Sequence, residues 1–307
     1  ANSLSHAESK MIVNKNKKIA TELSIIEKQV QVTINLLEEG GTVPFIARYR
    51  KEMTGSLDEV QVAAIRDRNQ QLVELDKRRE AILKSMNEME KLTPELERQI
   101  LEAETMTYLE DIYLPFKPKR KTKASIAREK GLQKLADFIL EQTNDDLEAE
   151  ALKYINVEKA VITIEDALSG ARDILAEFMA EQPELRMKMR EIFLQKGSFH
   201  SKLIKGKEIE GQKYKDYFDW TEAVKTAPSH RILALRRAEK EIILTLDIVV
   251  PEDDSITLLD SFFVKGRNAS SEQVRQAAAD SFKRLIKPSM ETEVRLFTKK
   301  KADTEAI

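Results

Sequence analysis

The sequence of 307 residues contains no cysteine and has only nine glycines, eight prolines and one tryptophan. Without cysteine, disulfide frameworks and zinc sites built on thiolates are excluded. The three histidines, His6, His200 and His230, lie far apart and do not suggest a metal site. So few glycines leave little material for a phosphate-binding loop, and the short motifs typical of nucleotide-binding and hydrolytic enzymes do not occur. We therefore expect no cofactor, no bound metal and no enzymatic activity.

Long apolar runs and an excess of one charge are also missing. No run of about 18 apolar residues or more is present, and no apolar signal segment opens the chain, so we expect a soluble, cytoplasmic protein with no membrane contact. The 51 basic and 53 acidic side chains leave a formal net charge of -2. The chain as a whole therefore does not attract nucleic acid or anionic lipid, and a local patch would have to do so.

The composition that remains is typical of helices. Hydrophobic residues make up 41% and charged residues 34%, with long stretches of Glu, Lys, Leu, Ala and Ile. The pattern predicts a mainly α protein, with a multi-helical region over residues 14–196 and a smaller α+β segment with a few strands over residues 197–307. Residues 1–13 are set apart as a tag or disordered stretch, because the opening lacks periodicity and Met11 could be a native start.

Local signals mark several elements. Ser24 with Glu27, and Ser56 with Glu59, have capping-box spacing and predict two helix starts. Residues 57–92 have no Gly or Pro and predict one long helix or two stacked end to end. Ile and Val enrich residues 242–250, which are the best strand candidate. Further helices are expected at residues 147–155, 167–180, 183–193, 229–240 and 271–285.

Two features near the end of the chain are assigned to irregular structure. The acidic residues Glu252, Asp253 and Asp254 follow the strand candidate, and a solvated turn is favoured there over a divalent-cation site. Residues 299–301 are expected to open a frayed, charged tail. Ser229 is expected to cap the helix that follows it, with His230 in a structural role, because neighbouring helix residues point in different directions and form no catalytic pair.

The most distinctive segment is residues 42–59, T-V-P-F-I-A-R-Y-R-K-E-M-T-G-S-L-D-E. A helix-turn-helix would place its turn at residues 53–56 and make phosphate contacts of the three basic residues Arg48, Arg50 and Lys51. The alternative is a packed helix that turns Phe45, Ile46 and Tyr49 toward the core and its basic residues toward water or acids.

A basic cluster follows at residues 117–130, where seven basic residues face one acid, Glu129, for a net charge of +6. Its members are Lys117, Lys119, Arg120, Lys121, Lys123, Arg128 and Lys130. Dense positive charge at an exposed place is enough for non-specific phosphate binding, and Tyr113 and Phe116 could add stacking surfaces. The alternative is a solvated charged face beside two aromatic core anchors.

Three segments carry a resemblance to a known family. Residues 42–59, residues 113–132 (Y-L-P-F-K-P-K-R-K-T-K-A-S-I-A-R-E-K-G-L) and residues 227–241 (A-P-S-H-R-I-L-A-L-R-R-A-E-K-E) strongly resemble the Tex family of bacterial transcription accessory proteins. The resemblance covers about residues 14–298 and implies a cytoplasmic protein associated with RNA or DNA and related to a eukaryotic transcription elongation factor. It also implies that a YqgF-like domain, a helix-hairpin-helix pair and an S1 RNA-binding domain lie downstream.

Two functions follow from residues and resemblance together. The first is a non-enzymatic helical scaffold that adds weak, non-specific phosphate contacts through the basic cluster and Arg48, Arg50 and Lys51. In the family the main nucleic-acid contacts are attributed to the S1 part, which implies an auxiliary role for these residues. The second is a protein-interaction scaffold that contacts the transcription machinery or its own downstream domains.

Overall fold

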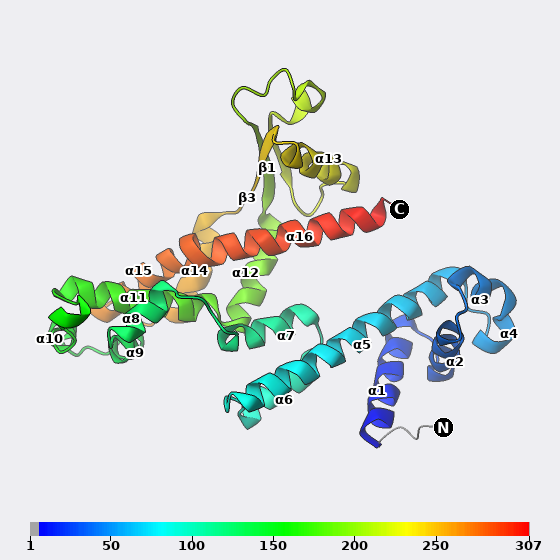
Figure 1. Cartoon of the computed structure of the whole chain (residues 1–307), viewed down its shortest axis with the longest axis horizontal. Coiled ribbons are helices and arrows are strands. Elements are labelled where there is room, and N and C mark those ends of the chain that lie inside the picture. The colour runs from blue at the N-terminus through cyan, green and yellow to red at the C-terminus, as the bar shows by residue number, and fades with distance from the viewer. Residues whose placement is uncertain (1–5, 307) are drawn as a thin grey trace. The chain divides into compact units, whose positions relative to one another are not determined.

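The computed structural model describes the backbone of residues 6–306 and the side chains of residues 14–306. The chain divides into two compact units, Ala1–Leu109 and Glu110–Ile307. Within the described residues helices predominate, and a small three-stranded antiparallel sheet is confined to the second unit (Figure 1). The predicted fold class, mainly α with a smaller α+β segment, is confirmed.

The first unit consists of helices joined by short connections. Its elements are α1 (His6–Leu23), α2 (Glu27–Glu38), α3 (Val43–Tyr49), α4 (Lys51–Thr54), α5 (Glu59–Glu88), α6 (Pro94–Glu102) and the start of α7 (Met106–Tyr113). The predicted long helix over residues 57–92 corresponds to α5. Fully buried aliphatic side chains from four helices, Ile19, Val30, Ile46 and Ile65, contribute to its core. Because these residues come from α1, α2, α3 and α5, hydrophobic burial holds the unit together.

Both serine caps predicted in this unit are wrong in the same way. Ser24 and Ser56 adopt the left-handed conformation, with φ of 56° and 64°, and end the preceding segment. The helices begin two residues later: α2 follows Ile26, whose N–H donates to Gln29 Oε1, and α5 follows Asp58, whose carboxylate accepts from the N–H of Gln61. The predicted helix-turn-helix segment contains three helices, with Met53 inside α4 and the turn at residues 55–58. The backbone of residues 6–13 lies in α1, within the stretch set apart as tag.

The second unit begins with the end of α7 and places α11 at its centre. Its helices are the 3-10 turn η1 (Leu114–Phe116), α8 (Lys123–Glu129), α9 (Gln133–Glu141), α10 (Leu147–Leu152), the 3-10 turn η2 (Val157–Lys159), α11 (Ile164–Ala180), α12 (Pro183–Lys196), the 3-10 turn η3 (Gln212–Tyr217), α13 (Ser229–Lys240), α14 (Glu252–Phe263), α15 (Ala269–Ser281), the π-helical segment η4 (Phe282–Ile286) and α16 (Lys287–Glu305). Helices α8, α9 and α15 contact α11, whose buried residues include Ala171, Ile174 and Leu175.

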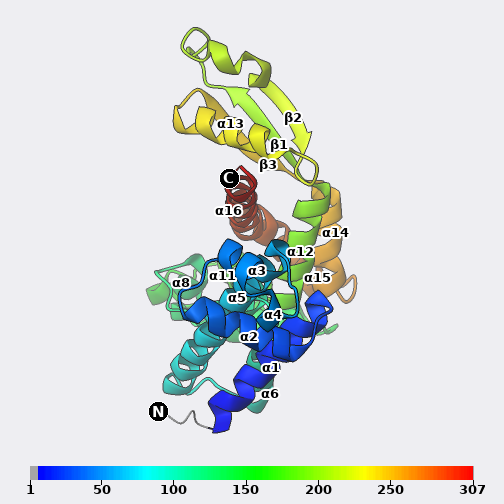
Figure 2. The ribbon, with the colours of Figure 1, turned by 90° about the vertical axis from the view of Figure 1, so that its right-hand side faces the viewer.

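The sheet follows α12 and has the order β2-β1-β3. Its strands are β1 (Ser198–Leu203), β2 (Asp219–Ala223) and β3 (Leu244–Val249). Strand β3 confirms the predicted strand, and its alternate residues Leu244, Leu246 and Ile248 are buried. Helix α13 lies beside the sheet in both ribbon views (Figures 1 and 2). Alternation along β3 therefore gives the sheet one face that is shielded from solvent and one that is exposed.

Three predictions for the C-terminal part are wrong. Residues 252–254 form the first turn of α14 rather than a loop, where acids complement the helix dipole. Residues 299–301 lie inside α16 rather than in a frayed tail. Ser229 does not cap α13: the N-cap is Pro228, and the Ser229 hydroxyl hydrogen-bonds to Glu305 of α16. The π-helical segment η4 precedes Pro288, whose missing N–H cannot continue a regular α-helical ladder.

Candidate nucleic-acid interface

The predicted basic cluster occupies an extended segment and the helix after it. Pro115 and Pro118 interrupt the helical path, and α8 begins where the Thr122 hydroxyl accepts a hydrogen bond from the N–H of Ser125 at 3.0 Å. Ala124 and Ala127 anchor α8 in the core of the second unit, on the side that contacts α11. The basic side chains of this segment therefore divide between positions that face α11 and positions that face water.

Lys119 and Arg128 are engaged by acids of α11. The Lys119 ammonium lies 2.8 Å from Glu177 Oε1 and also contacts Glu181, one helical turn further on. Arg128 Nη1 lies 3.6 Å from the same Glu177 oxygen, and the Thr122 hydroxyl donates to the other at 2.9 Å. These contacts attach the basic segment to the helix behind it. Lys119 and Arg128 therefore have an internal structural role.

Titration of the two acids reflects this arrangement. Burial raises the pKa of Glu177, but hydrogen bonds from Lys119 and Thr122 and the charge of Arg128 more than offset it, so the pKa of this carboxyl lies below its ordinary value. Burial also raises the pKa of Glu181, and the Lys119 contact only partly offsets it, so that pKa stays above the ordinary value. Lys119 thus contacts both acids, whose pKa values shift in opposite directions.

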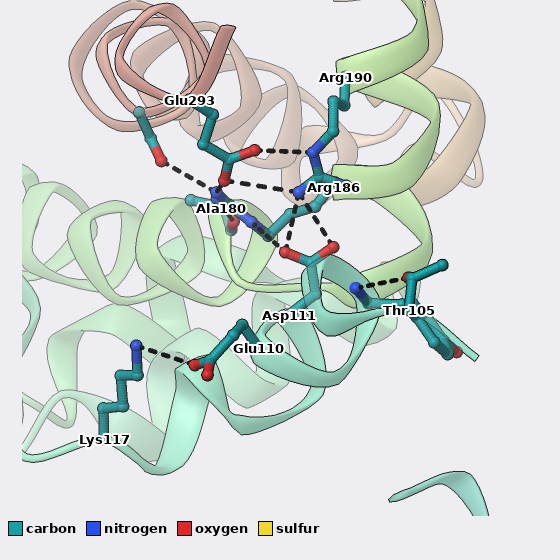
Figure 3. A network of polar contacts seen from close by, with 10 residues as sticks. Thr105, Glu110, Asp111, Lys117, Ala180, Arg186, Arg190 and Glu293 are labelled. Carbon is teal, nitrogen blue, oxygen red and sulfur yellow. Dashed lines mark hydrogen bonds and ion pairs between the residues drawn. The ribbon is translucent and has the colours of Figure 1, made fainter. Parts of the chain in front are cut away.

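Three further members of the cluster lie close to acids. Lys117 Nζ lies 3.3 Å from a carboxylate oxygen of Glu110 (Figure 3). Lys123 and Lys130 line a small cavity whose opposite wall carries Asp166 and Asp173 of α11. Burial raises the pKa of Asp173, and the charges of Arg284 and Lys123 offset this only in part. Backbone hydrogen bonds from Ile162 and Thr163 lower the pKa of Asp166, with a smaller contribution from the charge of Lys130. Lys117 is therefore paired with an acid, whereas Lys123 and Lys130 lie near acids without an ion pair among the described residues.

Arg120 and Lys121 differ from their neighbours. Both are exposed, and within the described part of the chain neither forms an ion pair with an acid. They lie between Lys119, which is attached to α11, and Thr122, which caps α8. The segment thus presents these two cations, close to the exposed Lys123, on a backbone that is held in place on both sides.

The aromatic residues beside the cluster do not offer the stacking surface considered from the sequence. Tyr113 is 8% exposed and belongs to the core, and Phe116 is half-buried. The alternative, that these rings anchor the segment, is therefore the correct one for Tyr113. The basic cluster is an electrostatic surface without an exposed ring from Tyr113.

The second predicted group, Arg48, Arg50 and Lys51, lies on α3 and α4 in the first unit. Within the side chains that the structure describes, none of the three forms an ion pair with an acid. The Arg50 guanidinium lies 4.7 Å from the centroid of the Phe45 ring and donates to the Tyr49 carbonyl at 3.0 Å, while Arg48 lies 5.9 Å from the Tyr49 ring. We name the surface formed by Phe45, Arg48, Tyr49, Arg50 and Lys51 the α3 face.

Exposure of the two rings contradicts the core interpretation of this helix. Ile46 is fully buried, but Phe45 is 40% exposed and Tyr49 is 60% exposed. The signal was present in the spacing, because Val43 and Ile46 form one stripe of the helix and Phe45 and Tyr49 form another, four residues apart. Both cation groups predicted from the sequence therefore exist, and the α3 face combines its charge with exposed rings.

A third cluster of charges was not found from the sequence. Asp111, at the end of α7, accepts from Arg186 Nε at 3.2 Å and from Arg190 Nη2 at 2.9 Å, and Glu293 of α16 accepts from both arginines (Figure 3). Burial raises the pKa of Asp111 despite the two guanidiniums, whereas Arg190 and Arg186 hold the pKa of Glu293 below its ordinary value even though burial raises it. The network joins three helices of the second unit through residues up to 182 positions apart in sequence.

Catalytic and metal-binding arrangements are not evident in the described chain. Among residues 14–306, no three His, Asp or Glu side chains lie together in a way that could hold a metal ion. Asp254 of the acidic trio forms an ion pair with Lys196 at 2.8 Å. No described helix is both long and apolar enough to cross a membrane.

The described residues form a mainly helical protein with a small antiparallel sheet and exposed basic side chains. Residues 142–307 match the family described as Tex central region-like, and residues 13–87 match the Tex-like protein N-terminal domain. The chain belongs to the Tex family, as the resemblance in the sequence predicted.

Three relatives illustrate the range of similarity. The chain is 41% identical over 301 residues to the transcriptional accessory protein Tex of Neisseria gonorrhoeae, covering 96% of this chain and 40% of that protein. It is 47% identical over 235 residues to protein tex of Bordetella pertussis, covering 76% of this chain and 30% of the relative. It is also 26% identical over 291 residues to human S1 RNA-binding domain-containing protein 1, covering 89% and 29% respectively. The chain therefore spans about 40% or less of the length of these relatives.

Proposed function

We propose that this chain is a non-enzymatic, cytoplasmic helical scaffold of a transcription accessory protein, and that it adds weak contacts to RNA or DNA phosphates without sequence preference. The observation that carries the proposal is the free pair Arg120 and Lys121, which is exposed, lacks an ion-pair partner among the described residues and sits on a segment attached to α11. Lys123 and Lys130 add charge beside it. Arg48, Arg50 and Lys51 supply a second, separate contact.

Free cations bind phosphate more readily than cations that already contact a carboxylate. A phosphate that binds a free cation releases a condensed counterion from the nucleic acid, and this gives affinity without sequence information. A cation that already contacts a carboxylate would first have to break that contact. Arg120 and Lys121 therefore contribute more than Lys119 and Arg128, although all four belong to the same run of sequence.

The names of the relatives support the same function. The Neisseria protein is named a transcriptional accessory protein, and the human relative is named for an S1 RNA-binding domain. Because both are much longer than this chain, the principal nucleic-acid contacts of a complete protein belong in our proposal to an S1 part outside it. The contacts of this chain are then auxiliary, which agrees with its net charge of -2.

Charge reversal of the free pair tests the proposal. We expect the double variant Arg120→Glu and Lys121→Glu to weaken binding of labelled single-stranded and duplex DNA and RNA alike. The slope of log affinity against log salt should become shallower by about two, because each lost phosphate contact removes about one. Fluorescence anisotropy at several salt concentrations measures both quantities.

A matched control keeps the change in net charge the same. Lys202 and Lys205 are exposed lysines of the same unit without an ion pair among the described residues, and their double change to Glu should leave the slope nearly unchanged. Equal losses in the two double variants would show a general charge effect and contradict the proposed site. Absence of wild-type binding at low salt would refute phosphate contact altogether.

A protein-interaction scaffold is the second candidate function. It is favoured by Leu296 and Phe297 of α16, which are 63% and 56% exposed on a helix whose Val294 and Thr298 are buried. Neighbouring exposed apolar side chains are characteristic of surfaces that contact protein. Capture of RNA polymerase subunits or of the protein's own downstream domains that persists after nuclease treatment, and is lost in a Leu296→Ser and Phe297→Ser variant, would support this function.

A further inference from the structure

The α3 face combines exposed aromatic rings with basic side chains that have no acidic partner among the described residues. Phe45 and Tyr49 are 40% and 60% exposed, and their ring centroids lie 5.3 Å apart at 47°. Burying these aromatic side chains would be favourable, yet α3 buries Val43 and Ile46 instead. Folding of the first unit therefore does not require the exposed rings.

Most of the charges next to the rings in sequence are positive. Arg48, Arg50 and Lys51 are consecutive or nearly so, Glu52 is the acid that follows them, and none of the three cations has an ion-pair partner among the described side chains. Arg50 lies over the Phe45 ring at 4.7 Å, and Arg48 lies farther from the Tyr49 ring, at 5.9 Å from its centroid. Tyr49 is the more exposed of the two rings. The face thus offers a π surface with cations on either side of it in sequence.

Single-stranded nucleic acid matches this combination in both parts. Its phosphates complement the three cations, and its unstacked bases present flat faces that stack on an aromatic side chain regardless of sequence. A duplex offers the same phosphates, but its bases are stacked on one another and cannot reach a ring on the protein surface. An acidic peptide would match the charge but would make no specific use of an exposed tyrosine ring.

We infer that the α3 face binds single-stranded RNA or DNA, with a base stacked on Tyr49 and phosphates held by Arg48, Arg50 and Lys51. The inference rests on the proposed nucleic-acid function and adds a preference for single strands at a defined place. It assigns discrimination between single strand and duplex to the rings of the first unit, whereas Arg120 and Lys121 of the second unit contact phosphates of either form.

The test replaces the Tyr49 ring by an apolar side chain without a π face. The whole chain, as wild type or as Tyr49→Leu, is titrated at low salt with three labelled probes: an oligothymidylate, an abasic oligodeoxynucleotide of equal length, and a duplex of equal length. We expect Tyr49→Leu to weaken oligothymidylate binding roughly fivefold or more, since stacking of one base contributes an effect of this size. Binding of the abasic strand and the duplex should change less than about twofold.

Two further variants separate stacking from other effects. Tyr49→Phe retains the ring and should bind oligothymidylate nearly as wild type does. Phe178→Leu removes a ring that is 38% exposed from α11 of the second unit and should change none of the three affinities. Because Tyr49 is exposed, all three variants should melt close to the wild-type temperature, which circular dichroism checks.

Each remaining outcome has a definite meaning. Unchanged oligothymidylate binding by Tyr49→Leu, or equal losses on all three probes, would overturn the inference while leaving the proposed function intact if the Arg120 and Lys121 reversal still weakens every probe. Tighter binding of a labelled oligoglutamate than of oligothymidylate, with the same dependence on Tyr49, would replace the nucleic acid by an acidic protein partner. If the wild type binds none of the nucleic-acid probes, both the inference and the proposed function fail.

Discussion

Two groups of basic side chains, one in each unit, are used differently. In the second unit, Arg186, Arg190 and Lys119 contact carboxylates from other segments, although only Arg186 is buried and Lys119 is exposed. In the first unit, Arg48 and Lys51 lie exposed on the α3 face without an ion-pair partner among the described residues. The density of positive charge along the sequence is similar in both places. What differs is whether the fold brings a carboxylate to the cation, and this decides which cations are available to a partner.

The acids that contact the basic side chains of the second unit lie far from them in the sequence. Glu177 and Glu181 are one turn apart on α11, so both reach Lys119, which lies more than 50 positions earlier in the sequence. Asp111 and Glu293 enclose Arg186 and Arg190 from two sides. Cations in such positions should stabilise the fold, and cations on the α3 face should not.

Removal of Asp111 should have the largest effect. Asp111→Ala leaves Arg186, whose side chain is 5% exposed, without one of its two acidic partners. Loss of one partner from a buried ion pair costs about 3–5 kcal/mol, because an uncompensated charge stays buried. Urea unfolding followed by the fluorescence of Trp220, the only tryptophan and a residue of the second unit, measures the loss.

Glu129 provides the control for this variant. It is an exposed acid of the same unit, and Glu129→Ala should change the free energy of unfolding by no more than about 0.5 kcal/mol. A cost below about 1 kcal/mol for Asp111→Ala would show that water or Glu293 compensates Arg186, and that the network is less important for stability than its burial indicates.

Substitution of Glu177 should have an intermediate effect that depends on pH. Glu177→Gln weakens the contacts with Lys119 and Arg128 and should cost about 1.5–3 kcal/mol at neutral pH, as expected for hydrogen bonds to a charged group. The pKa of Glu177 is lowered in the folded state, so its stabilising effect is present above the ordinary carboxyl pKa of 4.5 and is lost as the pH falls through the folded value.

The difference between wild type and Glu177→Gln should therefore be constant near neutral pH and shrink below about pH 4.5. Glu181, whose pKa burial raises, has the opposite dependence, but it is present in both proteins and largely cancels in the difference. A difference that stays constant down to pH 3 would mean that the Glu177 charge is not what Lys119 recognises. Thermal melts of both proteins across this pH range provide the data.

How much of the fold the sequence predicts depends on how polar each buried stripe is. Helix α5 and strand β3 were predicted because Ile, Leu and Val mark their buried positions. Helix α16 was missed because its buried stripe, Met290, Val294, Thr298 and Ala302, includes a polar and a small residue in its last two positions. Strand β1 was missed for a similar reason, since Phe199 and Ser201 form its inward face. Tertiary contacts stabilise these elements where their own pattern is weak.

The sequence indicates where basic residues cluster, but not which of their charges are neutralised. Runs of Lys and Arg identify where cations gather, and both predicted groups are present in the structure. Which of them is free depends on contacts such as that between Lys119 and Glu177, whose partners are 58 positions apart. The capping boxes failed for a local reason: Ser24 and Ser56 took the left-handed conformation that ends the preceding segment, and the residues that cap the next helices lie two positions later.

The smallest effect on stability is expected for Lys121. Its near neighbour Lys119 contacts two acids, so substitutions of these two lysines should have opposite effects on stability and on binding. Lys121→Ala should change the free energy of unfolding by no more than about 0.5 kcal/mol, because its side chain is exposed and forms no ion pair among the described residues. It should nevertheless make the salt dependence of nucleic-acid binding shallower by about one. Lys119→Ala should do the reverse and destabilise the fold with little change in that slope, since its ammonium already contacts Glu177 and Glu181. If Lys119→Ala instead changed the slope as Lys121→Ala does and left the unfolding free energy unchanged, the contact with α11 would not persist in solution, and both lysines would belong to the phosphate-binding surface.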